Sequence, residues 1–258
     1  MQLTFNPISI LLGILPGLVW LVYFSKKDKN PEPKTHILLA FFLGALSAGA
    51  ALFGGELLAT GFAQFFDRAS LVYVCLNYFI AVALVEELVK YLAVRMVITD
   101  LDEFDEPIDS MVYLVSAAMG FATAENVLTN IVKESSLTSL GSKFIGEHII
   151  INTIYRFFFP TLLHALCSAI VGYFLALAFF RSKKFATIIG LGLATFLHGS
   201  YDLLSYAFGG TGEAKFFLYM VGLLLLALIF VSRILFKQLR AQQIKKNKII
   251  WRFSPDKK

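Results

Sequence analysis

Two adjacent carboxylates lie inside an apolar run that is long enough to cross a membrane. Residues 79–95 read FIAVALVEELVKYLAVR, with Glu86 and Glu87 in the interior and Lys90 one turn later. A charged side chain near the centre of a bilayer costs roughly 3 kcal/mol. Two neighbouring carboxylates are harder still to ionise together, because their charges repel. The pair therefore indicates a functional site, whose chemistry depends on the residues that face it.

The composition predicts a multi-pass membrane protein. The chain is 57% hydrophobic and 16% charged, a balance that soluble domains rarely show. The net charge of +5 is better explained by lysines and arginines on one side of a membrane than by nucleic-acid binding. We expect one transmembrane domain over residues 1–258 of a plasma-membrane protein, ending in a basic cytoplasmic tail at 237–258.

The hydropathy pattern favours an all-α, polytopic helix bundle with about seven transmembrane helices. The expected spans are 8–24, 36–59, 70–98, 108–132, 148–180, 185–208 and 214–236, with a turn at Gly209–Gly212. We expect the first turns of the fifth span, up to Arg156 and Pro160, to lie in the membrane interface. Basic residues follow the first, fifth and seventh spans, which predicts an N-out, C-in topology.

Four consecutive spans each contribute ionisable residues that are expected deep in the membrane. They are Glu86, Glu87, Glu125, His164, His198 and Asp202. At 1.5 Å rise per residue the histidines and Glu125 fall in the outer half of the bilayer. The two neighbouring glutamates join them only if the third span begins outside the membrane.

Spacing along the helices groups these residues further. Residues four apart share a helix face, which pairs His198 with Asp202, Glu125 with Phe121, and Glu86 with Lys90. Packing alone explains a single intramembrane histidine. Six such residues on four helices are harder to explain in that way.

Carboxylates and imidazoles in a dry cavity can do two kinds of chemistry. A carboxylate can activate water as a general base. Alternatively, a divalent metal such as zinc, with Glu125, His164 and His198 as candidate ligands, can lower the pKa of a bound water. His198 or Asn126 can donate a hydrogen bond to an oxyanion.

Five motifs in order along the chain resemble the PrsW family of intramembrane proteases. They are Pro31-Glu32-Pro33, Glu86-Glu87-Leu88-Val89-Lys90, Gly120-Phe121-Ala122-Thr123-Ala124-Glu125-Asn126, His164-Ala165-Leu166-Cys167-Ser168 and His198-Gly199-Ser200-Tyr201-Asp202. The PrsW family is similar to the larger CAAX prenyl endopeptidase and bacteriocin-immunity superfamily. This chain departs from that group's EExxxR, FxxxH and HxxxN patterns, with Lys90 one place early, Glu125 for histidine and Asp202 for asparagine.

The resemblance implies cleavage of a single-pass membrane protein, such as an anti-sigma factor, on the extracytoplasmic side. We expect Glu86 or Glu87 to act as the base, with Glu125 and His164 positioning the water or a metal. His198, oriented by Asp202, would stabilise the oxyanion or complete a metal site, and Lys90, Phe121 and Asn126 would support the site. Two alternatives stay open: a proton- or metal-coupled transporter, and a non-catalytic immunity or binding protein.

Overall fold

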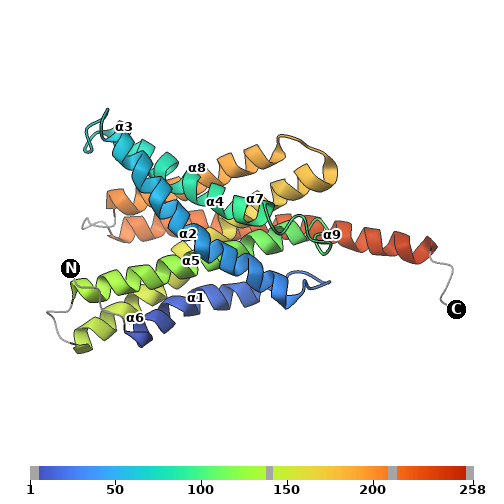
Figure 1. Cartoon of the computed structure of the whole chain (residues 1–258), viewed down its shortest axis with the longest axis horizontal. Coiled ribbons are helices and arrows are strands. Elements are labelled where there is room, and N and C mark those ends of the chain that lie inside the picture. Colours follow the sequence, from blue (N-terminus) through green and yellow to red (C-terminus); the bar gives the residue numbers. More distant parts are fainter. Residues whose placement is uncertain (1–5, 138–141, 209–213, 254–258) are drawn as a thin grey trace.

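The chain forms an all-helical bundle (Figure 1), seen in a computed structural model that describes residues 6–137, 142–208 and 214–253. Its elements are α1 (Pro7–Ser25), α2 (Lys34–Phe62), α3 (Leu71–Cys75), the π-helix η1 (Leu76–Leu84), α4 (Val85–Arg95), α5 (Asp109–Ser136), α6 (Ser142–Phe158), α7 (Pro160–Arg181), α8 (Ala186–Phe208) and α9 (Ala214–Phe253). The described residues contain no β-strand. The all-α prediction is therefore confirmed.

Polar side chains set several helix ends. The Asn6 side chain caps α1 by accepting a hydrogen bond from the Ile8 backbone amide at 3.0 Å. Ser70 caps α3 in the same way, because its hydroxyl accepts from the Tyr73 amide at 3.2 Å. Helix α7 ends where Ser182 adopts a left-handed conformation with φ 53°.

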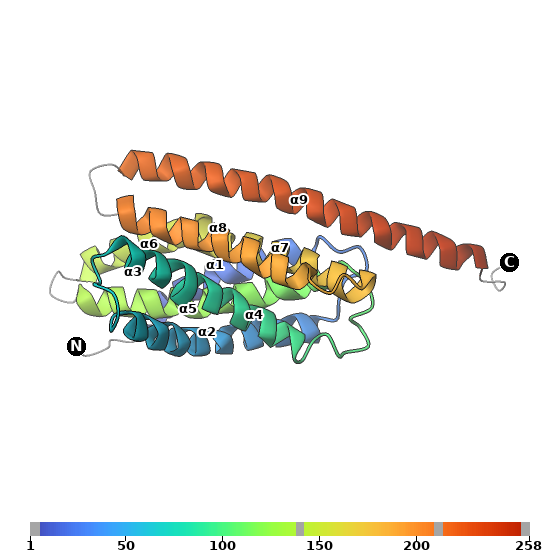
Figure 2. The ribbon, with the colours of Figure 1, turned by 90° about the horizontal axis from the view of Figure 1, so that it is seen from above.

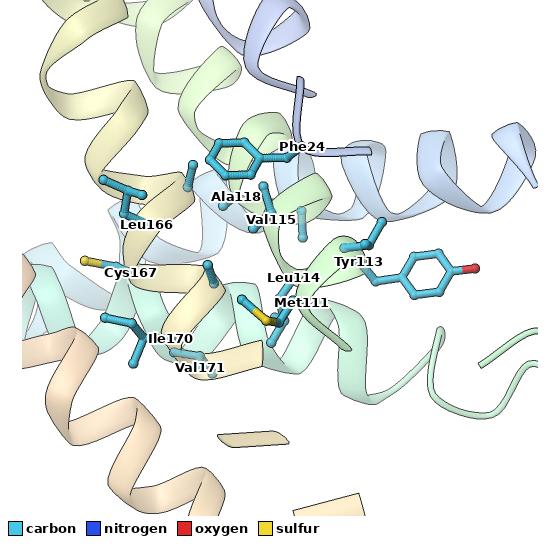
Figure 3. Close-up of a cluster of buried hydrophobic side chains, with 14 of the residues drawn as sticks. Phe24, Met111, Tyr113, Leu114, Val115, Ala118, Leu166, Cys167, Ile170 and Val171 are labelled. Carbon is cyan, nitrogen blue, oxygen red and sulfur yellow. The ribbon is translucent and has the colours of Figure 1, made fainter. Parts of the chain in front are cut away.

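Helix α5 runs through the middle of the bundle, and α1, α2 and α7 pack around it (Figure 1). A Cβ added to Gly120 would lie 1.8 Å from the Phe41 carbonyl oxygen of α2, and one added to Gly44 would lie 1.9 Å from that of Ala117. The two backbones thus touch at a crossing that only glycine permits, as is common between membrane helices. Between α5 and α7 lies an apolar layer that includes Met111, Leu114 and Ile170 (Figure 3).

Within the described residues, six helical stretches are long and apolar enough to cross a membrane. The sixth expected span, α8, is not among them, because His198 and Asp202 lower its mean hydropathy. The fifth expected span is divided at Phe159 and Pro160 into α6 and α7, since proline favours the first turn of a helix. The expected turn at Gly209–Gly212 lies outside the described residues, and the N-out, C-in orientation stays a prediction.

The third expected span is one continuous helical rod made of α3, η1 and α4. It begins at Leu71, fifteen residues before Glu86, and its start outside the membrane stays a prediction. Its middle is a π-helix of nine residues, a conformation that is rare and often found at functional sites. Helix α4 starts directly after it and carries Glu86 and Glu87 in its first turn.

Candidate active site

The structure brings the six candidate residues together from four helices. Glu86 and Glu87 come from α4, Glu125 from α5, His164 from α7, and His198 and Asp202 from α8. The centroids of the two imidazole rings are 5.0 Å apart. The condition that the glutamates reach the depth of the histidines is therefore met.

Glu87 is the more enclosed of the two neighbouring glutamates. It is 1% exposed, and its Oε1 accepts hydrogen bonds from Lys90 Nζ at 2.7 Å and from His198 Nδ1 at 3.0 Å. Its Oε2 accepts from the Ser168 hydroxyl at 3.4 Å. Both carboxylate oxygens are occupied, so Glu87 holds its neighbours in place and has no free oxygen for water.

Glu86 has the opposite environment. Its Oε2 is buried without a hydrogen-bond partner among the described residues. This oxygen lies 3.7 Å from Lys90 Nζ, 3.8 Å from His198 Nε2 and 4.0 Å from His164 Nδ1. Buried polar groups are normally hydrogen-bonded. The unpartnered oxygen between two imidazoles therefore indicates a place for a water molecule or an ion.

His164 is held from both sides. Its Nε2 donates to Glu125 Oε2 at 2.9 Å, and its Nδ1 accepts from Lys90 Nζ at 2.9 Å. Glu125 in turn forms an ion pair with Arg156 of α6, at 2.9 Å between Oε1 and Nη2. A chain of contacts thus runs from α6 to the imidazole at the centre of the site.

His198 is oriented by a different residue from the one that we expected. Its Nδ1 donates to Glu87, which leaves Nε2 facing the Glu86 carboxylate. Asp202 lies on the Nε2 side, with its Oδ2 at 3.5 Å. That oxygen is buried and has no hydrogen-bond partner within the described part of the chain. Asp202 therefore adds a second unsatisfied carboxylate oxygen next to Glu86.

The three supporting residues also reach the site, in different ways. The Lys90 ammonium lies 4.3 Å from the centre of the Phe121 ring, a cation–π contact, and that ring meets His164 edge-on at 5.4 Å. The Asn126 side chain donates to the Thr161 hydroxyl at 3.1 Å and accepts from Arg156 Nε. Its amide is thus used in positioning Arg156, in contrast to the oxyanion role that we considered.

The residues present fit a divalent metal ion. Glu86, His164 and His198 each offer one ligand atom, and these atoms all lie within 4.8 Å of one another. Tetrahedral coordination with bonds of about 2.1 Å places ligands roughly 3.4 Å apart. Glu86 Oε2 lies 3.8 Å from His198 Nε2 and 4.0 Å from His164 Nδ1, so the three side chains would draw slightly closer around an ion. Carboxylates on the far ring nitrogens, Glu87 and Glu125, match the outer-shell partners of metal-bound histidines. Lys90 donates a hydrogen bond to His164 Nδ1, so it would compete with a metal ion for that nitrogen. The expected set contained Glu125 in the place of Glu86.

A groove leads to the site from the side of the bundle. It has a volume of about 430 Å³ and lies between α2, η1 and α5, with Glu86 and Glu125 in its lining. Several small residues line it, namely Ala45, Ala48, Gly49, Ala51, Gly55, Ala59, Ala81 and Ala124. Helix α2 passes in front of this region (Figure 1). The groove gives the otherwise buried Glu86 its access from outside.

Sequence reasoning did not identify Arg156 as part of the site. We placed Arg156 in the first turns of the fifth span, which we expected to lie in the membrane interface. The side chain is 9% exposed and pairs with Glu125 across α5. A charged residue near a predicted span needs a partner, and Glu125 was the nearest unpaired acid in an adjacent span. The possible pairing of Arg156 with Glu125 was therefore the feature of the sequence that could have identified Arg156 as part of the site.

A bundle of membrane-length helices around buried carboxylates and imidazoles defines the class of intramembrane hydrolase. Comparison with known proteins places the chain within that class. Residues 32–232 match the model of the PrsW family, described as intramembrane metalloproteases. The chain belongs to the PrsW family, and it is accordingly a peptidase of the cell membrane.

Three curated relatives support this assignment, each named Protease PrsW. The protein of Geobacillus kaustophilus is 33% identical over 84% of this chain and 85% of its own length. The Bacillus subtilis protein is 29% identical over 74% of the chain and 80% of its own length, and that of Oceanobacillus iheyensis is 32% identical over 76% and 82%. No solved structure matches the chain significantly.

Proposed function

We propose that Glu86 is the residue at the centre of peptide-bond hydrolysis by this intramembrane protease. The observation that carries the proposal is its unpartnered Oε2, buried between the two imidazoles and reached by the groove. A water molecule there would lie against a carboxylate oxygen that has no hydrogen-bond partner among the described residues. Glu86 would then accept the proton of that water as general base.

The surrounding residues have positioning roles in this proposal. Glu87 fixes His198 through Nδ1, so that Nε2 faces the reacting groups. Glu125 holds His164 through Nε2 and is itself held by Arg156. Lys90 supplies positive charge beside both glutamates, at 2.7 Å from Glu87 and 3.7 Å from Glu86. Its ammonium can stabilise negative charge that develops on a scissile carbonyl.

A divalent ion, if bound, would be held by Glu86, His164 and His198. It would supply Lewis-acid activation of water and of the scissile carbonyl. Asp202, with its unpartnered Oδ2 at 3.5 Å from His198 Nε2, then remains the nearest carboxylate free to accept a proton.

We propose a single-pass membrane protein, such as an anti-sigma factor, as the substrate. The groove opens between α2 and η1 and is lined by small residues, which leaves room for a peptide backbone to approach Glu86. A helix 10–12 Å wide does not fit a space of about 430 Å³, so the substrate would enter as an extended segment. Extended backbone is also the form in which a peptide bond can be attacked.

Co-expression with a tagged single-pass anti-sigma substrate tests the proposal. We expect Glu86→Gln to lower cleavage by about 100-fold or more, as loss of a catalytic base or ligand does. The matched control is Glu56→Gln, a glutamate that lies elsewhere in the lining of the same groove and is not in contact with the imidazoles. Wild-type cleavage by Glu86→Gln would overturn the proposal.

Metal content separates the two forms of the chemistry. If an ion is used, purified wild-type protein contains about one divalent ion per chain, and His164→Ala and His198→Ala lose that ion together with activity. If Glu86 acts without an ion, chelation leaves cleavage unchanged. Elemental analysis of the same preparations, before and after chelation, gives the answer directly.

A further inference from the structure

A second cavity lies away from the candidate active site, between α1, α6, α7 and α9. Its volume is about 490 Å³. Aromatic and aliphatic side chains form most of its wall, among them Val19, Trp20, Phe24, Ile229 and Phe236. Four cations stand at one end of it, Lys27 from the segment after α1 and Arg233, Lys237 and Arg240 from α9. The cavity is thus apolar along its length and strongly basic at one end.

The cavity exists because α1 and α9 meet through large rings. Phe24 and Phe236 stack with their centroids 6.0 Å apart, and Trp20 Nε1 donates a hydrogen bond to the Phe157 carbonyl at 2.9 Å. Val19 and Tyr23 line the cavity and are themselves exposed on the outer surface of the bundle. The cavity therefore opens toward the bilayer. Figure 2 shows α9 running along the outside of the bundle.

Two polar atoms in this lining have no hydrogen-bond partner among the described residues. Ser232 is 2% exposed and its hydroxyl is unpartnered, and Arg240 Nε is also buried and unpartnered. A buried donor without an acceptor costs about 1–3 kcal/mol. Both atoms are donors in a cavity of otherwise apolar character, so they call for a ligand that carries acceptor oxygens.

We propose that this cavity is a binding site for a membrane phospholipid with an anionic headgroup. One acyl chain lies against Trp20, Phe24 and Phe236, and an ester oxygen accepts from Ser232. The phosphate lies among Lys27, Arg233, Lys237 and Arg240. The stretch of α9 from Ile229 to Arg240 is roughly 16 Å long at 1.5 Å per residue, which suits a chain lying along the helix.

The size of the cavity argues against a protein occupant. A transmembrane helix is 10–12 Å wide, which is too wide for a space of about 490 Å³ that is partly closed by the Phe24–Phe236 stack. The four cations also select for negative charge, which membrane-spanning segments rarely carry. Basic pockets between membrane helices are known to hold anionic lipid headgroups.

Binding is tested with the full chain in nanodiscs of phosphatidylcholine, titrated with phosphatidylglycerol. Lipid binding is followed by native mass spectrometry. We expect Arg233→Ala/Lys237→Ala/Arg240→Ala to weaken retention of phosphatidylglycerol roughly 100-fold, at about fivefold per cation. The matched control is Arg181→Ala/Lys183→Ala/Lys184→Ala, which removes the same charge from exposed positions between α7 and α8. This control should keep wild-type retention.

Two further experiments distinguish a bound phospholipid from free phosphate and from a protein occupant. Inorganic phosphate added to phosphatidylcholine nanodiscs should not raise the melting temperature, whereas phosphatidylglycerol should. A photo-crosslinking residue in place of Val19 should yield a lipid adduct. The proposal is overturned by equal losses in the two triple variants, by a phosphate effect equal to that of the lipid, or by a crosslink to the protein substrate or a second copy of the chain. Ser232→Ala, a small change, should weaken retention without preventing folding.

Discussion

Glu87 of α4 accepts a hydrogen bond from Nδ1 of His198 in α8, at 3.0 Å, although the two residues are more than a hundred positions apart in the chain. The same oxygen accepts from Lys90 at 2.7 Å. One buried carboxylate therefore joins two helices and fixes the imidazole tautomer. Its neighbour Glu86 makes no such bond through Oε2.

This difference predicts opposite consequences for two otherwise identical substitutions. Glu87→Gln should lower the unfolding free energy by about 3 kcal/mol or more, since Lys90 loses its charge partner in a buried pair. Glu86→Gln should leave stability unchanged or raise it, because it removes a buried negative charge whose Oε2 has no hydrogen-bond partner among the described residues. Denaturation in detergent, followed in parallel with cleavage, measures both.

The outcome that contradicts this assignment is equally clear. If Glu86→Gln destabilises the protein and Glu87→Gln leaves both stability and folding intact, the roles of the two glutamates are reversed. Leu88→Ala, at an exposed neighbouring position, serves as control for changes in α4.

Arg156 should act on the reaction only through Glu125. We expect Arg156→Gln to lower kcat by about 10-fold, because Glu125 and His164 lose their fixed orientation. In a double-mutant cycle, Arg156→Gln combined with Glu125→Gln should cost no more than Glu125→Gln alone. Additive losses would show that Arg156 has a separate role. Cleavage kinetics that resolve kcat from KM are the required measurement.

The groove should be sensitive to its small residues. A Cβ at Gly49 meets no atom within 4 Å, so Gly49→Leu adds bulk to the groove without disturbing the packing. We expect this variant to raise KM for a membrane-anchored substrate by about 10-fold or more. Gly192→Leu in α8 is the matched control, because a Cβ there also meets nothing within 4 Å and the position lies outside the groove. Equal effects of the two changes would contradict the access route.

Glu32, from the Pro31-Glu32-Pro33 motif, lies in the loop before α2, more than fifty residues before Glu86 in the sequence. Burial raises its pKa above the usual value of 4.5, and the Tyr113 hydroxyl donates a hydrogen bond to it. The folded state therefore holds the Glu32 proton more tightly than the unfolded state does. Stability from this residue is complete below pH 4.5 and is lost as the pH rises through the raised value.

Glu32→Gln cannot ionise and still accepts the bond from Tyr113. We expect the melting temperature of this variant, minus that of the wild type, to increase from about pH 4.5 upward. Thermal unfolding in detergent across pH 4–8 measures the difference. A difference that is constant with pH, or that decreases, would show that Glu32 ionises normally in the folded protein.

The sequence was enough to find the helices and the acids, because both follow from the cost of charge in a bilayer. Glu86, Glu87 and Glu125 stand out in apolar runs whatever the fold. Which glutamate is free depends on what α7 and α8 bring to each face of α4, and residues adjacent in a helix point in directions about 100° apart. This information lies in the packing of the helices against one another, which sequence patterns do not show. For the same reason the sequence did not show that Glu86 lies between the two imidazoles, while Glu125 holds the far nitrogen of His164.

The π-helix η1 had no signal that sequence patterns could supply, whereas the break at Phe159 had one in Pro160. Residues 76–84 have ordinary helix-forming composition, and their conformation reflects the packing of neighbouring helices. Phe79 of η1 lies against Gly199 of α8, where a Cβ would be 2.6 Å from the ring. Pro160 was read as a feature within one span, although it begins a new helix and lets α6 bring Arg156 to Glu125.

The ion pairs of the candidate site leave its formal charges unbalanced. Four carboxylates, Glu86, Glu87, Glu125 and Asp202, face two permanent cations, Lys90 and Arg156, which leaves an excess of two when both imidazoles are neutral. Two negative charges remain in a region of low dielectric constant. One divalent cation cancels them, and so do two additional protons. Occupation of the site by either is therefore coupled to the other, so metal uptake should release protons into the surrounding solution.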